Sequence, residues 1–214
     1  MTLEIAHLQT WIGRTEVLDD AATVAPLRAL TATLDRSDAP VQPGAALPPA
    51  WHWLYFLPIA RQSQIGPDGH PHRGGFLPPV PLSRRMWARS RMEFHAPLHV
   101  GQSLSRHSRI LDVRVKDGRT GPLVFVNLRH EVHGEGRLAI TEDQDIVYRG
   151  MPAPGEVAPP PSAAPTDAAW ERRVVPDEVL LFRYSALTFN GHRIHYDRKY
   201  VTEVEGYPGL VVHG

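Results

Sequence analysis

The segment 121-GPLVFVNLRHEVHG-134 decides the fold class, because its side chains alternate in character along the chain. Val124, Val126 and Leu128 fall on one face of an extended chain, whereas Arg129 falls on the opposite, more polar face. A period of two is typical of a β-strand with one buried face. The segment therefore predicts a long strand with two unlike faces.

Three further segments carry strand patterns, at residues 86–95, 102–115 and 138–148. The sequences 116-KDG-118 and 133-HGEG-136 separate consecutive strands and are typical of hairpin turns. We therefore expect an antiparallel meander. Strands of about ten residues exceed the usual length of about five or six, so the sheet is expected to curve strongly and to wrap around one helix.

Two segments before the sheet carry helix patterns. Val24, Leu27 and Leu34 share one helical face, which predicts an amphipathic helix over residues 24–34. The aromatic run 47-LPPAWHWLYFL-57 predicts a short buried helix, whose rings we expect in the core, with the lining of an acyl pocket as the alternative. A helix held by a long antiparallel sheet is an α+β arrangement.

Proline and glycine mark the loops and the domain boundary. Residues 65–81 combine glycine turns with several prolines and predict a long loop, which either lines a site or decorates the surface. Six prolines fall in the fifteen residues 151–165, which predicts a linker over 151–170. The linker separates a domain at 1–150 from a block at 171–214, which is too short for a core of its own and must pack against another part.

Charge and composition exclude several classes of function. The 23 basic and 23 acidic side chains cancel, so no electrostatic footprint for nucleic acid is expected. The chain has no cysteine, which excludes disulfides and thiolate chemistry and is most natural in a reducing compartment. No segment has the pattern of a membrane span or a signal peptide. We therefore expect a cytoplasmic protein with no nucleic-acid partner and no membrane partner.

Polar and titratable side chains gather near the end of the chain. The set comprises Asn190, His192, Arg193, His195, Tyr196, Asp197 and His213. Asn190 and His195 are too far apart for one helical face and have the wrong parity for one strand face, so they converge only across a turn, for which Gly191 is suited. Such a loop can bind a polar substrate and move a proton near pH 7, because imidazole titrates there.

Metal binding and purely structural roles are the alternatives for these histidines. His192 and His195 have a spacing that metal sites use, but zinc would need a third ligand from Asp197 or His213, and no cysteine is available. Histidines can also cap turns or pair with acidic neighbours. We predict a functional cluster without a metal.

Several segments resemble a known family. Residues 184-YSALTFNGHRIH-195 and 206-GYPGLVVHG-214 resemble the hydratase motif of the MaoC-like hot-dog hydratases and dehydratases. The sequences of these two segments are most similar to those of the subgroup that contains mitochondrial 3-hydroxyacyl-thioester dehydratase type 2 and the mesaconyl-CoA and itaconyl-CoA hydratases. In the first block, 51-WHWLYFLP-58, 74-GGFLPPVPLSRRMW-87 and 121-GPLVFV-126 also resemble this subgroup. The resemblance covers essentially the whole chain.

The resemblance implies an α+β double hot dog, in which two curved antiparallel sheets each wrap around a central helix and an acyl thioester lies in a tunnel between them. Residues 1–150 would form the N-terminal dehydratase-like repeat, which shapes the tunnel without reacting. Residues 171–214 would start the C-terminal catalytic repeat. That second repeat is expected to be incomplete here, with a sheet and its helix absent by comparison with the family.

The resemblance also implies roles for individual residues. His195 matches the catalytic histidine, and Asn190 stands at the position of the family's catalytic aspartate. Because an amide cannot accept a proton as a base, His195 is the expected base and Asn190 would orient the water or the carbonyl; alternatively, Asp197 supplies the missing charge. Gly214 matches the glycine whose backbone N–H polarises the thioester carbonyl, and His213 would fix that turn.

The implied reaction is reversible addition of water across a 2,3-enoyl thioester, which gives a 3-hydroxyacyl thioester without a cofactor. The expected substrate-binding residues are His192, Arg193, Tyr196, Asp197 and His213. Arg193 would bind the carboxylate of a dicarboxylic acyl group such as mesaconyl or itaconyl, or would instead pair structurally with Asp197 or Glu203.

The resemblance leaves open which carrier holds the acyl group and which related function the chain has. The acyl group would be carried by coenzyme A or acyl carrier protein, and Arg84 and Arg85 would either meet the phosphates of coenzyme A or begin a solvated strand. The alternative functions are a 3-hydroxyacyl dehydratase of fatty-acid synthesis that acts on acyl carrier protein, a thioesterase of the same fold, and a non-catalytic acyl-thioester-binding subunit that needs a partner chain. The 192-HRIHYD-197 loop favours hydration, and a homodimer is the expected assembly.

Overall fold

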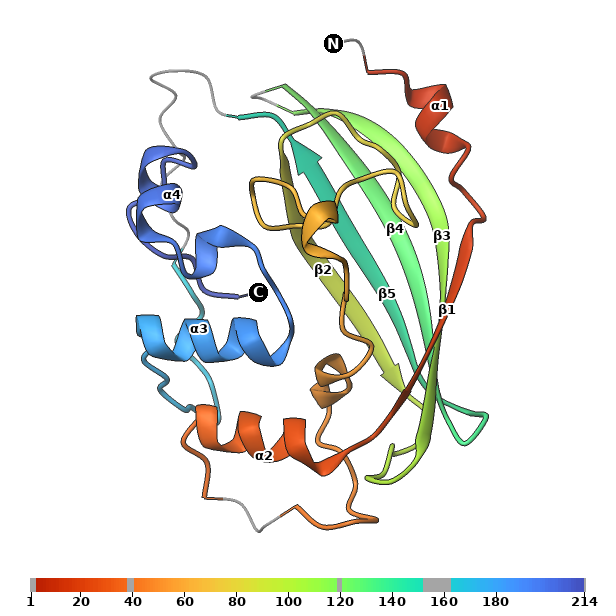
Figure 1. The fold of residues 1–214 in the computed structure, drawn as a ribbon, viewed down its shortest axis with the longest axis vertical. Helices are drawn as coiled ribbons and strands as arrows, with labels where there is room; N and C mark the ends of the chain where they lie inside the picture. The colour runs from red at the N-terminus through yellow and green to blue at the C-terminus, as the bar shows by residue number, and fades with distance from the viewer. Residues whose placement is uncertain (1–2, 38–40, 119–120, 152–162, 214) are drawn as a thin grey trace.

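The computed structural model describes residues 3–37, 41–118, 121–151 and 163–213. Its main element is one antiparallel sheet with the strand order β1-β3-β4-β5-β2 (Figure 1). The strands are β1 (Thr15–Ala21), β2 (Arg84–Phe94), β3 (Ser103–Gly118), β4 (Gly121–Gly134) and β5 (Arg137–Arg149). The four strands predicted from side-chain alternation are therefore confirmed.

The predicted meander is correct only for β3, β4 and β5. β2 precedes β3 in the chain but pairs with β5 at one edge of the sheet, in a register that sets Arg84 opposite Arg149 and Phe94 opposite Ile140. β1 pairs with β3 at the other edge and has no counterpart among the predicted strands, because its side chains are mostly exposed and lack a buried face. Side-chain alternation identifies a strand but does not show which other strand it pairs with, so it could not predict the strand order.

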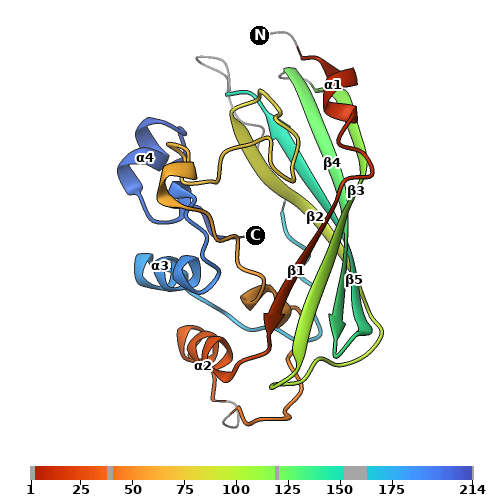
Figure 2. The ribbon, with the colours of Figure 1, turned by 45° about the vertical axis from the view of Figure 1, so that its right-hand side comes forward.

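The helices lie mainly on one side of this sheet. They are α1 (Ile5–Gln9), α2 (Val24–Thr33), α3 (Glu178–Leu187) and α4 (Arg198–Glu203), with the 3-10 turns η1 (Trp51–Leu54), η2 (Gln62–Gln64) and η3 (Arg193–His195). α2, α3 and α4 cover the same face (Figures 1 and 2). The predicted amphipathic helix and the short helix of the aromatic run are confirmed as α2 and η1. Across the described ranges, no helix has the length and apolar character needed to cross a bilayer.

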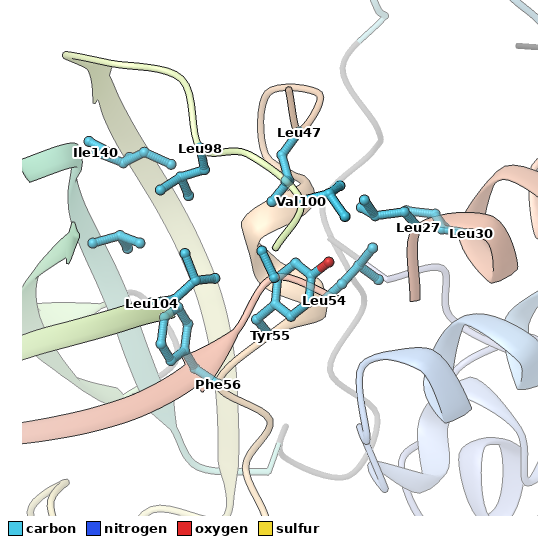
Figure 3. Packing of buried hydrophobic residues seen from close by; sticks show 13 residues of the cluster. Leu27, Leu30, Leu47, Leu54, Tyr55, Phe56, Leu98, Val100, Leu104 and Ile140 are labelled. Carbon is cyan, nitrogen blue, oxygen red and sulfur yellow. The ribbon is translucent and has the colours of Figure 1, made fainter. Parts of the chain in front are cut away.

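The main core fills the space between α2 and the sheet. Leu27 of α2 belongs to the same buried cluster as Leu104 of β3 and Ile140 of β5 (Figure 3). Tyr55 and Phe56 of the aromatic run belong to it as well and are only 4% and 5% exposed. Both rings therefore serve as core, as expected.

The block after residue 170 packs against the first domain, as its short length requires. α3 lies beside α2, and Tyr184 and Leu187 of α3 pack against the cluster that contains Leu27. Arg172 adds a hydrogen bond from its guanidinium to the carbonyl oxygen of Leu34, at 2.7 Å. Most of the predicted linker, residues 152–162, lies outside the described residues.

A buried carboxylate links η1 to the sheet. Glu142 of β5 is 3% exposed and accepts hydrogen bonds from Ser90 Oγ at 2.6 Å and Trp53 Nε1 at 3.1 Å, with His52 Nε2 at 3.5 Å. Burial alone would raise the pKa of Glu142, but the hydrogen bonds from His52, Ser90 and Trp53 outweigh it and hold this pKa below its usual value. The carboxylate is therefore charged and fully used in structure.

We expect Glu142→Ala to lower the free energy of unfolding by about 3 kcal/mol, because it leaves the buried His52 and the half-buried Ser90 and Trp53 without their acceptor. Denaturant unfolding measures this change. The matched control is Asp143→Ala, since Asp143 pairs with Arg129 where both side chains are more than 40% exposed, at 42% and 45%, and should change stability by less than about 0.5 kcal/mol. Because the pKa of Glu142 is lowered on folding, its contribution is present above its unfolded pKa and is lost as the pH falls through the folded value. Equal effects of the two substitutions would contradict this assignment.

Candidate active site

The candidate site is built on the loop between α3 and α4, and three side chains fix its shape. α3 begins after Asp177, whose Oδ1 accepts the N–H of Leu180 at 2.8 Å. After α3, the Oδ1 of Asn190 accepts the N–H of His192 at 3.0 Å, which closes an Asx turn. Asp197 then caps α4 by accepting the N–H of Tyr200 at 3.0 Å. The η3 turn that carries His195 is held between these caps.

His195 is buried, with 6% exposure, and one of its ring nitrogens is already bound. Nδ1 lies 2.7 Å from the carbonyl oxygen of Val211. A carbonyl oxygen only accepts, so Nδ1 carries the proton and Nε2 keeps its lone pair. Burial lowers the pKa of His195 below its usual value, against the opposing effect of the Val211 hydrogen bond. His195 is therefore a neutral imidazole at pH 7 with Nε2 available as a base.

Two more histidines contact this ring. The ring of His213 stacks on His195 at 3.7 Å between centroids, and the ring of His192 meets it edge-on at 5.6 Å. Burial, with the neighbouring His70 and His195, lowers the pKa of His192 to about 3. Burial, with the neighbouring His195, lowers the pKa of His213 to about 4. His192 and His213 are therefore uncharged at neutral pH. They do not repel the positive charge that His195 gains when it takes up a proton.

The first domain contributes the loop at 65–81 to the site, with two residues, Asp68 and His70, that sequence reasoning missed. The ring of His70 lies 4.0 Å from that of His192, and Nδ1 of His70 lies 3.0 Å from Oδ2 of Asp68. The backbone N–H of Arg193 donates to the carbonyl oxygen of Asp68 at 2.9 Å. Of the two roles left open for the loop at 65–81, the contacts of Asp68 and His70 therefore support the lining of a site. The available signal was the Asp-Gly-His sequence inside the long loop at 65–81.

The loops approach so closely that a side chain does not fit between them. Gly69 has a φ of +90°, and a Cβ placed on it would lie 1.8 Å from the carbonyl oxygen of Gly191. Only glycine allows both this backbone conformation and this contact. The contact brings the histidines of the two blocks into one cluster.

Arg193 and Asp197 form an ion pair. Nη2 and Nε of Arg193 lie 2.7 and 3.0 Å from Oδ2 of Asp197, and the guanidinium lies over the ring of Tyr200 at 4.2 Å. Of the two roles considered for Arg193, the geometry supports the structural pair with Asp197, and not the pair with Glu203. Both carboxylate oxygens of Asp197 are engaged, so it does not supply the charge that Asn190 lacks.

Of the remaining predicted site residues, three make hydrogen bonds within the site region and one lies outside the described residues. The amide oxygen of Asn190 is used to hold the turn. The predicted hydrogen bond of Asn190 to the water or to the substrate carbonyl would therefore come from its amide nitrogen, and it stays a prediction. The hydroxyl of Tyr196, 43% exposed, donates to the carbonyl oxygen of Gly191 at 2.9 Å. Nε2 of His213 lies 2.9 Å from the hydroxyl of Ser185, which anchors its stacked ring. Gly214 lies outside the described residues, so the role of its N–H as a donor to the thioester carbonyl stays a prediction.

Comparison with known proteins gives the family. The family model described as hydroxyacyl-thioester dehydratase type 2 matches residues 50–214. The chain belongs to this family. A mesaconyl-C(4)-CoA hydratase of Chloroflexus aurantiacus is 51% identical over 209 residues, which cover 98% of this chain and 75% of that protein. A mitochondrial hydroxyacyl-thioester dehydratase type 2 of Schizosaccharomyces pombe is 29% identical over 92% of this chain and 75% of its own.

Solved structures confirm the fold of this dehydratase type 2 family member. A MaoC-like dehydratase from Phytophthora capsici matches with a TM-score of 0.60 at 16% identity, over 99% of this chain and 72% of that one. The HtdX protein of Mycobacterium tuberculosis matches with a TM-score of 0.57 at 17% identity, over 94% and 71%. The predicted α+β hot-dog class is therefore confirmed, and membership of the dehydratase type 2 family makes the chain a hydro-lyase.

One group in this dehydratase type 2 site has the spacing of a metal site. Asp68, His70 and His192 each offer a ligand atom, and these atoms lie within 4.8 Å of one another. The Asp68 carboxylate is already hydrogen-bonded to His70, however, and the positive charges of Arg85 and Arg73 act on His70 as well. The positive charges of these two guanidinium groups disfavour a cation at this site.

Proposed function

We propose that the site centred on His195 adds water reversibly across the 2,3 double bond of an enoyl thioester of coenzyme A. The observation that carries this proposal is the fixed tautomer of His195. Its Nδ1–H is committed to the carbonyl of Val211, so a neutral Nε2 in a buried cluster can take a proton from water. The family supports hydro-lyase chemistry, and the relative named as a CoA hydratase supports coenzyme A as the carrier.

The proposed step balances as an addition. Nε2 of His195 removes one proton from water, the water oxygen bonds to C3, and negative charge develops on the thioester oxygen. The predicted donor to that oxygen is the backbone N–H of Gly214. The proton held by His195 then bonds to C2, which regenerates the neutral base and gives the 3-hydroxyacyl thioester. Dehydration is the reverse of the same steps.

The proposal is tested by following the ultraviolet absorbance of the conjugated enoyl thioester with crotonyl-CoA and mesaconyl-CoA, and the mass of the product. We expect loss of the conjugated band and a product heavier by one water. Release of free thiol from coenzyme A, detected with a thiol reagent, would instead indicate a thioesterase. Hydration of neither substrate would overturn the proposal in favour of a binding subunit without catalytic activity.

The pH dependence of the reaction follows from the state of His195. Because His195 must be neutral to act as a base and burial lowers its pKa below 6.5, kcat/KM should stay level as the pH falls from about 8 to 6.5. It should decline only below that value, as the base becomes protonated. Initial rates over this range measure the profile, with thermal unfolding at each pH as the control. An acidic limb centred above pH 6.5, with the protein still folded, would contradict the assignment.

A further inference from the structure

We infer that Arg85 binds a carboxylate on the acyl group of the substrate and so selects dicarboxylic enoyl thioesters. The inference rests on the proposed function, since it places the acyl group beside His195. The Arg193 ion pair with Asp197 leaves this role without its expected residue, and the structure offers another guanidinium close to the histidine cluster.

Arg85 faces the site from the start of β2. It is half-buried and lines a small cavity together with Asp68, His192 and Ile194. His195 is not among the lining residues, but its ring lies 5.6 Å from that of His192, so one histidine links the cavity to the candidate base. The positive charge of Arg85 also contributes to lowering the pKa of His70 and of His192, although burial is the larger cause for both. Arg85 therefore acts electrostatically on the cluster that holds the base.

The neighbouring Arg84, unlike Arg85, has a carboxylate partner in this cavity. Arg84 pairs with Glu205 at 2.8 Å, both side chains being 10% exposed, and lies over the ring of Tyr207 at 5.2 Å. Across the parts of the chain that the structure describes, Arg85 has no carboxylate partner. A half-buried guanidinium without a counter-ion keeps much of its desolvation cost, which an anionic ligand would offset.

A second donor lies directly opposite Arg85. Tyr148 of β5 pairs with Arg85 in the sheet register, so both side chains point to the same face. Tyr148 is fully buried, and its hydroxyl makes no hydrogen bond of good geometry within the described residues, although the guanidinium of Arg85 interacts with it. The guanidinium of Arg73 lies 5.2 Å from the centre of its ring. The N–H groups of Arg73 already donate to backbone carbonyl oxygens of residues 80, 82 and 83, so Arg73 adds only positive charge. Arg85 and the Tyr148 hydroxyl beside it are the donors left for an anion.

The chemistry of the substrate explains why a carboxylate would sit here. When an enoyl thioester carries a carboxylate on C3, that carboxylate is one bond away from the carbon that receives the hydroxyl group. The group that binds the carboxylate must therefore lie next to the base. Arg85 meets this requirement through the shared cavity with His192, and a bound charge next to C3 would also fix the face to which water adds.

Binding of two saturated ligands tests the inference without relying on catalysis. Succinyl-CoA and butyryl-CoA differ at C4, which is a carboxylate in the first and a methyl group in the second. We expect Arg85→Met to weaken succinyl-CoA binding by about 10- to 100-fold, as for the loss of a charge-assisted hydrogen bond. Butyryl-CoA binding should change by less than about threefold. Isothermal titration calorimetry measures both, and Arg85→Lys should restore part of the selectivity.

The controls separate the possible failures. Arg91→Met removes an exposed arginine from the same strand and should leave both affinities unchanged. An equal loss for both ligands with Arg85→Met would place the contact on coenzyme A, and no loss for either would leave Arg85 without a ligand; each result overturns the inference. Arg85→Gln replaces the methionine variant if that variant fails to fold. The proposed function fails separately, if the wild-type protein hydrates neither crotonyl-CoA nor mesaconyl-CoA.

Discussion

Replacing His195 with asparagine is expected to lower kcat for enoyl-CoA hydration by about 100- to 10,000-fold, the usual contribution of a general base. Asparagine can still donate a hydrogen bond to the carbonyl of Val211 through its amide nitrogen, so the loop between α3 and α4 keeps its anchor. What is lost is the lone pair on Nε2, because an amide nitrogen cannot accept a proton. The measurement is the initial rate of loss of the conjugated absorbance.

Two further measurements make this result specific to catalysis. Binding of butyryl-CoA should stay within about threefold of the wild-type value, since the substitution keeps the hydrogen bond that anchors the loop. His7→Asn is the matched control, because His7 is an exposed histidine on α1, and it should keep full activity. A His195→Asn variant that hydrates at more than about a tenth of the wild-type rate would remove His195 as the base.

Replacing Gly69 with alanine is expected to separate the two halves of the site. The added methyl group would lie 1.8 Å from the carbonyl oxygen of Gly191, so one loop must move away from the other. That movement breaks the hydrogen bond from Arg193 N–H to Asp68 and draws His70 away from His192. We expect a loss of roughly 3 kcal/mol in the free energy of unfolding and at least about a tenfold loss of kcat/KM.

The control for Gly69→Ala isolates the contact from the backbone conformation. Gly44 has a φ of +80°, close to the +90° of Gly69, but nothing lies within 4 Å of a Cβ placed on it. Gly44→Ala should therefore cost only the strain of the left-handed conformation, about 1 kcal/mol, and should keep full activity. Denaturant unfolding and hydration rates compare the two variants. If both lose the same stability and Gly69→Ala keeps its activity, the close approach of the loops does not assemble the site.

Local patterns in the sequence were sufficient for the strands, the helix at α2 and the position of the candidate base. The alternation of Val124, Val126 and Leu128 predicts a strand with one buried face, and all three side chains are buried in β4. The motif at 192–195 likewise located His195, whose side chain is buried in the structure. These features depend on neighbours a few residues apart, and such neighbours are written in the sequence itself.

The sequence by itself determined the α+β class, the family resemblance and His195. Only the tertiary structure decided that β2 joins β5, that the Asp68–His70 loop packs on His192, and that Arg193 is held by Asp197 while Arg85 has no carboxylate partner among the described residues. The physical reason is the range of the contacts. Periodicity defines which face of a segment is apolar, but packing and charge compensation between segments far apart in the chain choose which faces and side chains meet.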